Sequence, residues 1–184
     1  MEASLALVRE NDLKPEQIAE VVIGVDTGGM HYCEPVSVRH YPRNAVDLQF
    51  SIPYNVANAI INRKVSFEHY TEEALGRKDV LEFLATKVKS WLDPEVCFDD
   101  VGKACTAARL QVKTKDGKLY VKRVDHPKGD PTNPMTLDEI IEKFWDCAEL
   151  LARPIARENL KAVVDLIAHL EKVENVASVV RLLT

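Results

Sequence analysis

The sequence predicts an α+β protein: a small sheet with helices on one side, followed by a C-terminal helical segment. Three observations support this fold class. A strand pattern occupies residues 18–25, a hairpin pattern occupies residues 108–124, and apolar residues recur at helical spacing between and after them. Strands separated by helices in this way are typical of one layer of helices packed on a small sheet.

The composition is that of a soluble globular protein. The 184 residues are 46% hydrophobic and 29% charged, enough for one domain with a core and an appendage. The net charge of −5 argues against nucleic-acid binding and against anionic membranes, and no apolar run has the length of a membrane span. With no signal-type segment, no CxxC pair among the four cysteines and no paired metal ligands, we expect a cytoplasmic protein with reduced, mostly buried thiols.

The first third of the chain alternates helix, strand and loop. Residues 2–9 have helical composition but no N-cap, so this helix is entered partway along. Residues 18–25 are rich in β-branched side chains and read as a strand, which residues 27–29 break with two glycines. We expect residues 30–45 to form a long loop with one short helix, and long ordered loops are often functional.

The rest of the chain is organised around a buried helix within residues 47–62. Pro53 is tolerated only in the first helical turn, and Ser51 can accept a hydrogen bond from the N–H groups of that turn. Tyr54 also sits in the first turn, where its hydroxyl can project beyond the packed body of the helix. A helix start with free N–H groups, a serine and a tyrosine can hold an anion, while the alternative is a core helix with an amphipathic boundary tyrosine.

Other basic and polar side chains near this helix suit the same kind of ligand. His40 can be cationic, Arg43 offers a bidentate fork, and Tyr54 donates one hydrogen bond, so the three together suit a polycarboxylate. The alternative is that the histidine and arginine belong to a solvated surface. The sequence does not show that these side chains converge.

Two more helices are expected before the hairpin. Residues 66–75 form a short amphipathic pattern, and a longer helix begins at Asp79, a fair N-cap with Glu82 at the third helical position. Its core face extends as far as Val88, and a turn follows at residues 93–94.

The hairpin at residues 108–124 turns at Asp116 and Gly117, which suit a two-residue loop. Such a loop pairs Thr114 with Leu119 and Val112 with Val121. One face is then apolar, and the other, which carries Tyr120, is wet.

The C-terminal part has a different character. Residues 128–135 are rich in glycine and proline and are expected to be a hinge between an α+β domain, residues 1–127, and helices within residues 136–184. Thr136 and Glu139 form a capping box at the start of the first of these helices. Three apolar stripes follow, and they need a partner surface.

Several of these segments resemble the MmgE/PrpD family, which includes 2-methylcitrate dehydratase, cis-aconitate decarboxylase and an iminodisuccinate epimerase. The resemblance rests on residues 43–57 around Asp-Leu-Gln-Phe-Ser-Ile-Pro-Tyr, on the Asp116-Gly117 hairpin, on residues 128–136 leading to Lys143-Phe144, and on residues 13–18. It covers most of this chain but only the later part of a full family member.

The resemblance implies a fold and a chemistry. Family members have a large helical domain and a smaller α+β lid, and this chain resembles the lid followed by the helices that return to the helical domain. The parent reaction adds or removes water, or removes CO2, on a small polycarboxylate without metal or organic cofactor. The family's tyrosine at the active-site cleft corresponds to Tyr54, with Ser51, Arg43 and His40 as further candidate substrate-binding residues.

The sequence also departs from the family pattern. The family lid opens with a Lys–x–aromatic–Pro motif and a nearby histidine, thought to serve acid–base chemistry with residues of the helical domain, and none of the five histidines here stands in that context. We therefore expect no catalytic residue in this chain and two functional alternatives. It is a fragment or split subunit of such a lyase, inactive alone, or a non-catalytic carboxylate-binding or assembly module. Either way it pairs with a second copy or with a separate helical-domain chain.

Overall fold

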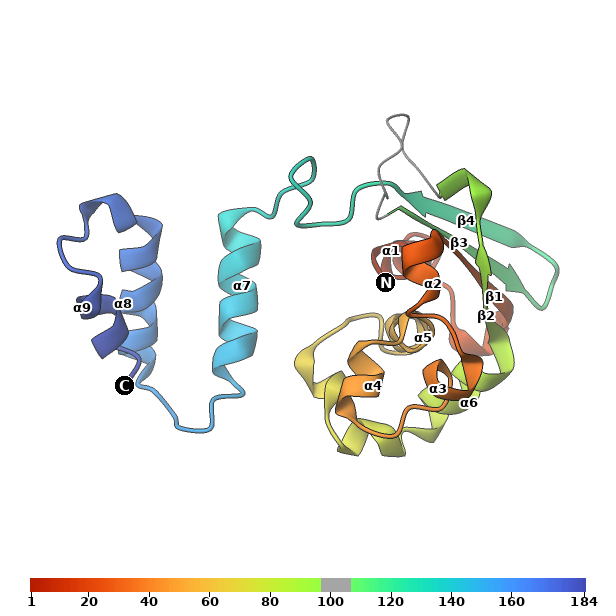
Figure 1. Ribbon diagram of the computed structural model, residues 1–184, viewed down its shortest axis with the longest axis horizontal. Coiled ribbons are helices and arrows are strands. Elements are labelled where there is room, and N and C mark those ends of the chain that lie inside the picture. The colour runs from red at the N-terminus through yellow and green to blue at the C-terminus, as the bar shows by residue number, and fades with distance from the viewer. Residues whose placement is uncertain (97–106) are drawn as a thin grey trace. The chain divides into compact units, whose positions relative to one another are not determined.

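The computed structural model describes residues 1–96 and 107–184 and divides into two compact units, Met1–Pro134 and Met135–Thr184. The first unit contains a four-stranded sheet with the order β2-β1-β3-β4, where β1 pairs with β2 in parallel and with β3 antiparallel (Figure 1). The strands are β1 (Ile18–Val25), β2 (Val88–Leu92), β3 (Ala108–Thr114) and β4 (Leu119–Val124). The α+β fold class predicted from the sequence is confirmed.

The helices of the first unit pack on one face of this sheet. Helix α1 contacts β3 and β4, α5 contacts β2, and α6 contacts β1. The α-helices are α1 (Glu2–Glu10), α2 (Thr27–Met30), α3 (Val36–Arg39), α4 (Ala45–Gln49), α5 (Ile52–Asn62) and α6 (Lys78–Lys87). Short 3-10 turns are η1 (Pro15–Gln17), η2 (Phe67–Tyr70), η3 (Glu73–Gly76) and η4 (Pro94–Val96).

The core lies between the sheet and these helices. Val21 and Ile23 of β1 and Val112 of β3 point into it, and helices α5 and α6 supply Ile60 and Leu84, all almost fully buried. Each such side chain stabilises the fold by about 1.5–3 kcal/mol through removal of apolar surface from water. The expected strand at residues 18–25 and the buried central helix are therefore confirmed.

Strand β2 is an element that the sequence did not predict. The helical pattern was expected to continue to Val88, but α6 ends at Lys87 and Val88 is already extended. Val88 pairs with Val21, and the next four residues continue along β1. An edge position beside a buried strand overrides local helix preference here, because the β1 backbone supplies hydrogen-bond partners that only an extended chain can use. The helix also begins one residue before Asp79, with Arg77 as the N-cap residue.

The β3–β4 hairpin differs from its predicted register by one residue. Its loop has three residues, because Gly117 takes a left-handed conformation with φ of +89° and Thr114 pairs with Lys118. Val112 therefore lies opposite Tyr120. A shift of one residue exchanges the two faces of a strand. Tyr120 accordingly packs against the core, whereas Leu119 is 60% exposed.

The expected amphipathic helix at residues 66–75 is also absent. Its place is taken by the two short turns η2 and η3, which contact each other, while η2 also receives a hydrogen bond from Tyr54 at the start of helix α5. These turns matter for function because they form one wall of the pocket described below.

The second unit contains α7 (Leu137–Ala148), α8 (Arg157–Ala168), the 3-10 turn η5 (Leu170–Lys172) and α9 (Ala177–Arg181). The capping box is confirmed, since Glu139 N donates to Thr136 Oγ1 over 3.3 Å and Thr136 N donates to Glu139 Oε2 over 2.7 Å. Leu160 and Val163 are buried within this unit. The roles of residues 128–135 as a hinge and of residues 136–184 as helical-domain elements stay predictions.

A buried ion pair at the end of β1 depends on a glycine. Asp93 is fully buried and accepts a hydrogen bond from Arg109 Nε over 2.7 Å. A Cβ atom on Gly24 would lie 2.5 Å from Asp93 Oδ2 and 3.0 Å from Asp93 Cβ. The carboxylate cannot move away without losing its partner, and an unpaired buried charge is costly.

We therefore predict that Gly24→Ala destabilises the first unit by about 1–3 kcal/mol, the usual range for overpacking. Urea unfolding measures this. Gly76→Ala is the matched control, because nothing lies within 4 Å of its added Cβ. Equal stability of the two variants would contradict the role of the Asp93 contact.

Candidate functional site

The candidate site begins at the N-terminus of α5. Ser51 caps this helix, since its Oγ accepts a hydrogen bond from Tyr54 N over 3.0 Å and donates one to Arg39 O over 2.6 Å. The predicted cap is confirmed. Ile52 N donates to Tyr32 O over 3.0 Å, and Pro53 has no N–H. The donors of the first turn are therefore already used, so the expectation of free N–H groups for an anion is wrong.

Tyr54 is buried rather than open to solvent. Only 1% of its surface is exposed, and its hydroxyl donates a hydrogen bond to His69 O over 2.6 Å. Burial raises the pKa of Tyr54 above its usual value, so the hydroxyl keeps its proton. The expectation of an accessible hydroxyl is wrong because turn η2 covers it, and the sequence did not predict this turn.

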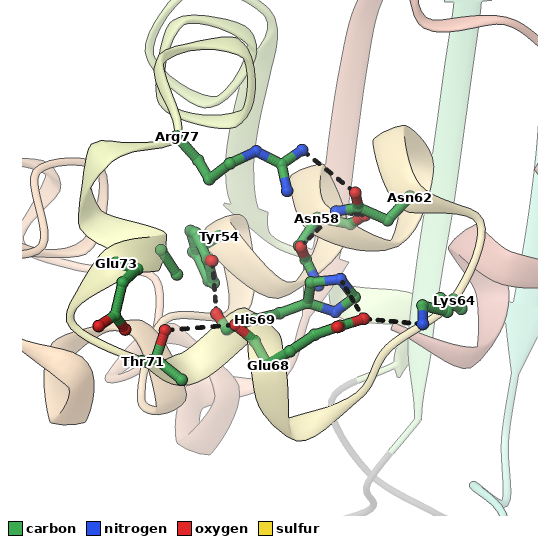
Figure 2. A pocket seen from close by; sticks show the side chains of 10 residues that line it. Tyr54, Asn58, Asn62, Lys64, Glu68, His69, Thr71, Glu73 and Arg77 are labelled. Carbon is green, nitrogen blue, oxygen red and sulfur yellow. Dashed lines mark hydrogen bonds and ion pairs between the residues drawn. The ribbon is translucent and has the colours of Figure 1, made fainter.

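A pocket of about 340 Å³ lies where helix α5 meets turns η2 and η3 (Figure 2). Its lining is mostly polar. The residues that form it are Tyr54, Asn58, Asn62, Lys64, Glu68, His69, Thr71, Glu73, Ala74 and Arg77.

The pocket contains both signs of charge. Lys64 Nζ lies 2.7 Å from Glu68 Oε1, and Arg77 Nη2 lies 2.7 Å from Asp79 Oδ2. The hydrogen bond from Lys64 lowers the pKa of Glu68, and the hydrogen bond from Arg77 lowers the pKa of Asp79. Both carboxylates therefore remain ionised at neutral pH.

His69 is the imidazole in this pocket. It is buried, and its Nδ1 accepts a hydrogen bond from Ser66 N over 3.2 Å, so the neutral ring carries its proton on Nε2. Burial is the main cause that lowers the pKa of His69, and the ring is neutral at pH 7. Sequence reasoning missed this residue. The signal available was the spacing Ser66-x-x-His69, which gives a side-chain cap to a short turn.

Two asparagines connect Arg77 to the wall of the pocket. Arg77 Nη2 donates to Asn62 Oδ1 over 3.2 Å, and Asn62 Nδ2 donates to Asn58 Oδ1 over 2.7 Å. Sequence reasoning missed this network as well. The sequence feature that could have revealed it is a pair of asparagines four residues apart on an apolar helix, because that spacing places them on one face.

The other two sequence-predicted site residues lie elsewhere. His40 and Arg43 line a different pocket with Lys78 and Glu82. His40 is buried, which lowers its pKa, whereas the Arg43 side chain is largely exposed and lies 4.0 Å from Asp47. The structure therefore does not bring them together with Tyr54. Their part in substrate binding stays a prediction.

A comparison with known families shows which family this chain belongs to. Residues 1–169 match the model of the MmgE/PrpD C-terminal domain. This chain belongs to the MmgE/PrpD family. The match extends well beyond the segments that carried the resemblance and includes the pocket at α5.

Three further observations concern the described part of this MmgE/PrpD chain. Among residues 1–96 and 107–184, no group of three or more histidine, cysteine, aspartate or glutamate side chains could hold a metal ion. No helix in the described part of the chain is long and apolar enough to cross a membrane. Cys33 is buried and Cys147 is exposed, both with free thiols, while Cys97 and Cys105 lie outside the described residues.

The burial of Tyr54 leads to a stability prediction. Tyr54→Phe removes the hydroxyl and leaves His69 O without this donor, so it should cost about 1–2 kcal/mol of unfolding free energy. Tyr32→Phe is the matched control, since Tyr32 is 44% exposed and its hydroxyl bonds to no residue that the structure describes. Urea unfolding of both variants measures the difference. A negligible cost for Tyr54→Phe would show that the hydrogen bond to His69 contributes nothing.

Proposed function

We propose that this chain is the C-terminal part, or a separate subunit, of an MmgE/PrpD-type lyase. The reaction adds or removes water, or removes CO2, on a small polycarboxylate such as 2-methylcitrate, without metal or organic cofactor. The observation that carries the proposal is the pocket beside Tyr54, where Lys64 and Arg77 present positive charge in a chain of this family.

The chemistry of these donors supports a carboxylate ligand. Arg77 pairs with Asp79 through Nε and Nη2, which leaves its Nη1 without a hydrogen bond among the described residues, and Lys64 offers a point charge. Glu68 and Asp79 already pair with the two cations, so the pocket has little net charge of its own. A ligand carboxylate would compete with Glu68 for Lys64.

Acid–base catalysis is assigned to residues outside the described pocket. His69 is the imidazole lining it, and its Nδ1 is already bonded to Ser66 N. General acid–base catalysis needs a group that can exchange protons near neutral pH, and burial disfavours the protonated form of this ring. We propose that these groups are the lysine and histidine of the family's Lys–x–aromatic–Pro motif, together with aspartate and histidine residues of a helical domain.

We predict that the purified chain neither dehydrates 2-methylcitrate nor decarboxylates cis-aconitate above background. Product formation is followed by chromatography, with and without a second chain that carries the family's helical domain and Lys/His motif. Turnover should appear only in the mixture. Turnover by the purified wild-type chain that Tyr54→Phe abolishes would overturn this assignment.

A non-catalytic carboxylate-binding or assembly module is the second candidate function. Exposed apolar side chains on the second unit favour it, because they offer an interface that needs no chemistry. The same mixing experiment separates the two, since a module gains no turnover from a helical-domain chain.

The same exposed side chains also lead us to propose that the chain assembles into an oligomer. They are Leu137, Ile140, Leu150, Leu151, Ile167, Leu170, Val176, Val180 and Leu183. Each contributes about 1.5–3 kcal/mol when fully buried, so a free solvated unit is disfavoured. A symmetric dimer is the commonest way for identical chains to cover such a surface.

We therefore predict a homo-oligomer, most simply a dimer built by residues 137–184, unless a helical-domain chain takes that place. Light scattering at micromolar concentration measures the mass. Val180→Asp should shift it toward the monomer, whereas Val121→Asp, at a similarly exposed position on β4, should not. A wild-type monomer would contradict the prediction.

A further inference from the structure

His69 contributes to the wall of the pocket in two ways. Its backbone oxygen accepts the hydrogen bond from the Tyr54 hydroxyl over 2.6 Å, which connects turn η2 to the start of helix α5 (Figure 2). Its buried side chain caps the same turn, because Ser66 N donates to His69 Nδ1 over 3.2 Å. In return, His69 N donates to Ser66 O over 3.1 Å. One residue therefore both closes turn η2 and holds it against α5.

The cap on turn η2 requires a neutral imidazole. Nδ1 of His69 accepts a hydrogen bond only while it carries a lone pair, whereas both ring nitrogens of an imidazolium are donors. After protonation, the new N–H would face the N–H of Ser66, and two donors cannot form a hydrogen bond. Ser66 Oγ lies 3.4 Å from Nδ1 and can accept the new proton, but Ser66 N then loses its acceptor. Protonation of His69 therefore breaks the cap.

The charged groups around the ring do not compensate for this loss. Glu68 Oε1 lies 3.6 Å from His69 Nε2 and favours an imidazolium, but it already pairs with Lys64 over 2.7 Å. Lys64 and Arg77 disfavour an imidazolium by charge repulsion. The elements and segments around η2 bring these charged side chains: Asp47 on α4, Lys64 after α5, Glu68 in η2 itself, and Glu72, Glu73 and Arg77 at η3. Asp47 and Glu72 already accept hydrogen bonds from backbone N–H groups.

Burial sets the sign of the pH dependence. It is the largest cause that lowers the pKa of His69 below the ordinary value of 6.5, while Glu68 raises this pKa. An open turn, whose ring is in water, therefore binds more protons than the closed turn between the two pKa values. The closed turn has its full stability above about pH 6.5 and loses it as the pH falls through the lowered pKa. Glu68 stays ionised in this range, because its pKa is lowered from 4.5.

We propose that His69 is a pH-sensitive latch on the pocket: turn η2 stays closed against α5 while the ring is neutral and opens when the ring is protonated. Glu68 and His69 of η2 line the pocket, so an open turn removes one of its walls. The latch is a form of regulation of the site assigned above, and its effect on a bound substrate rests on the proposed function. Acidification then releases a ligand that the closed wall retains.

NMR of the ¹⁵N-labelled 184-residue chain tests the latch between about pH 5 and pH 8. The His69 ring should titrate below pH 6.5, and the hydrogen-exchange protection factor of Ser66 N–H should fall with the same midpoint. The limit of this fall is about tenfold for each pH unit that separates the pKa values of the closed and open ring. Val21, in the core of the sheet, should keep its protection, because the opening is local.

Two results would overturn the latch. One is a His69 ring that titrates at or above pH 6.5. The other is Ser66 protection that stays constant while His69 titrates, because the turn would then remain closed around an imidazolium.

His69→Asn keeps the acceptor of the cap and removes the titration. The amide oxygen of the new side chain can accept from Ser66 N in place of Nδ1, and it gains no proton in this pH range. Ser66 protection should therefore become independent of pH. His40→Asn is the matched control and should keep the wild-type response, since His40 is also buried but lines a different pocket. A response that survives His69→Asn would refute the latch.

Tyr54→Phe serves as a second variant if His69→Asn does not fold, as judged by NMR dispersion. It removes the bond between α5 and the turn but leaves the imidazole cap, so Ser66 protection should be lower at every pH and should still fall as His69 titrates. Protection equal to that of the wild type would contradict the closed state.

These measurements use neither a ligand nor a partner chain, so they are independent of the proposed lyase function. Failure of a helical-domain chain to restore turnover would leave the latch intact. Absence of the latch would leave a lyase whose pocket keeps this wall at every pH.

Discussion

The hydroxyl of Ser51 is the contact on which the first unit's functional side depends. It accepts a hydrogen bond from Tyr54 N and donates one to Arg39 O, so one side chain starts helix α5 and connects it to the last residue of α3. With Pro53 in the first turn, the helix can begin only there. This start determines the positions of Tyr54, Asn58 and Asn62 along one side of α5, and these three residues line the pocket.

The same arrangement changes what Tyr54 does in this chain. Its hydroxyl is bonded to a backbone carbonyl of turn η2 rather than free in a cleft. In its buried position it supports the wall of the pocket, and the cationic side chains that line the pocket are Lys64 and Arg77. A site that binds through fixed donors while the acid–base groups come from another domain is consistent with the proposed role of this part of the family.

The two units differ in how much of their apolar surface they bury by themselves. The first unit closes its own core between sheet and helices, with Asp93 and Arg109 satisfied inside it. The second unit buries Leu160 and Val163 but leaves most of its apolar side chains half exposed. Short helices rarely persist without packing, because the free energy of a helix comes mainly from burying its apolar face. The proposed assembly would supply that burial.

The parts of the fold that depend on local chemistry were predictable. The strand at β1 follows from its β-branched residues, the start of α5 from Ser51 and Pro53, and the start of α7 from the Thr136–Glu139 capping box. Each of these signals acts over a few residues of chain and needs no distant partner. The family resemblance also rested on such local segments.

What depends on distant partners was decided only by the tertiary structure. Strand β2 became a strand because β1 offered an edge, and the hairpin changed register because Gly117 allowed a three-residue loop. The candidate site shows the same division. The sequence singled out Tyr54 but not the pocket, because Asn58, Lys64, His69 and Arg77 come from α5 and from turns whose path depends on packing. By itself the sequence determined which helix carries the site. The pocket itself arises only where those elements meet.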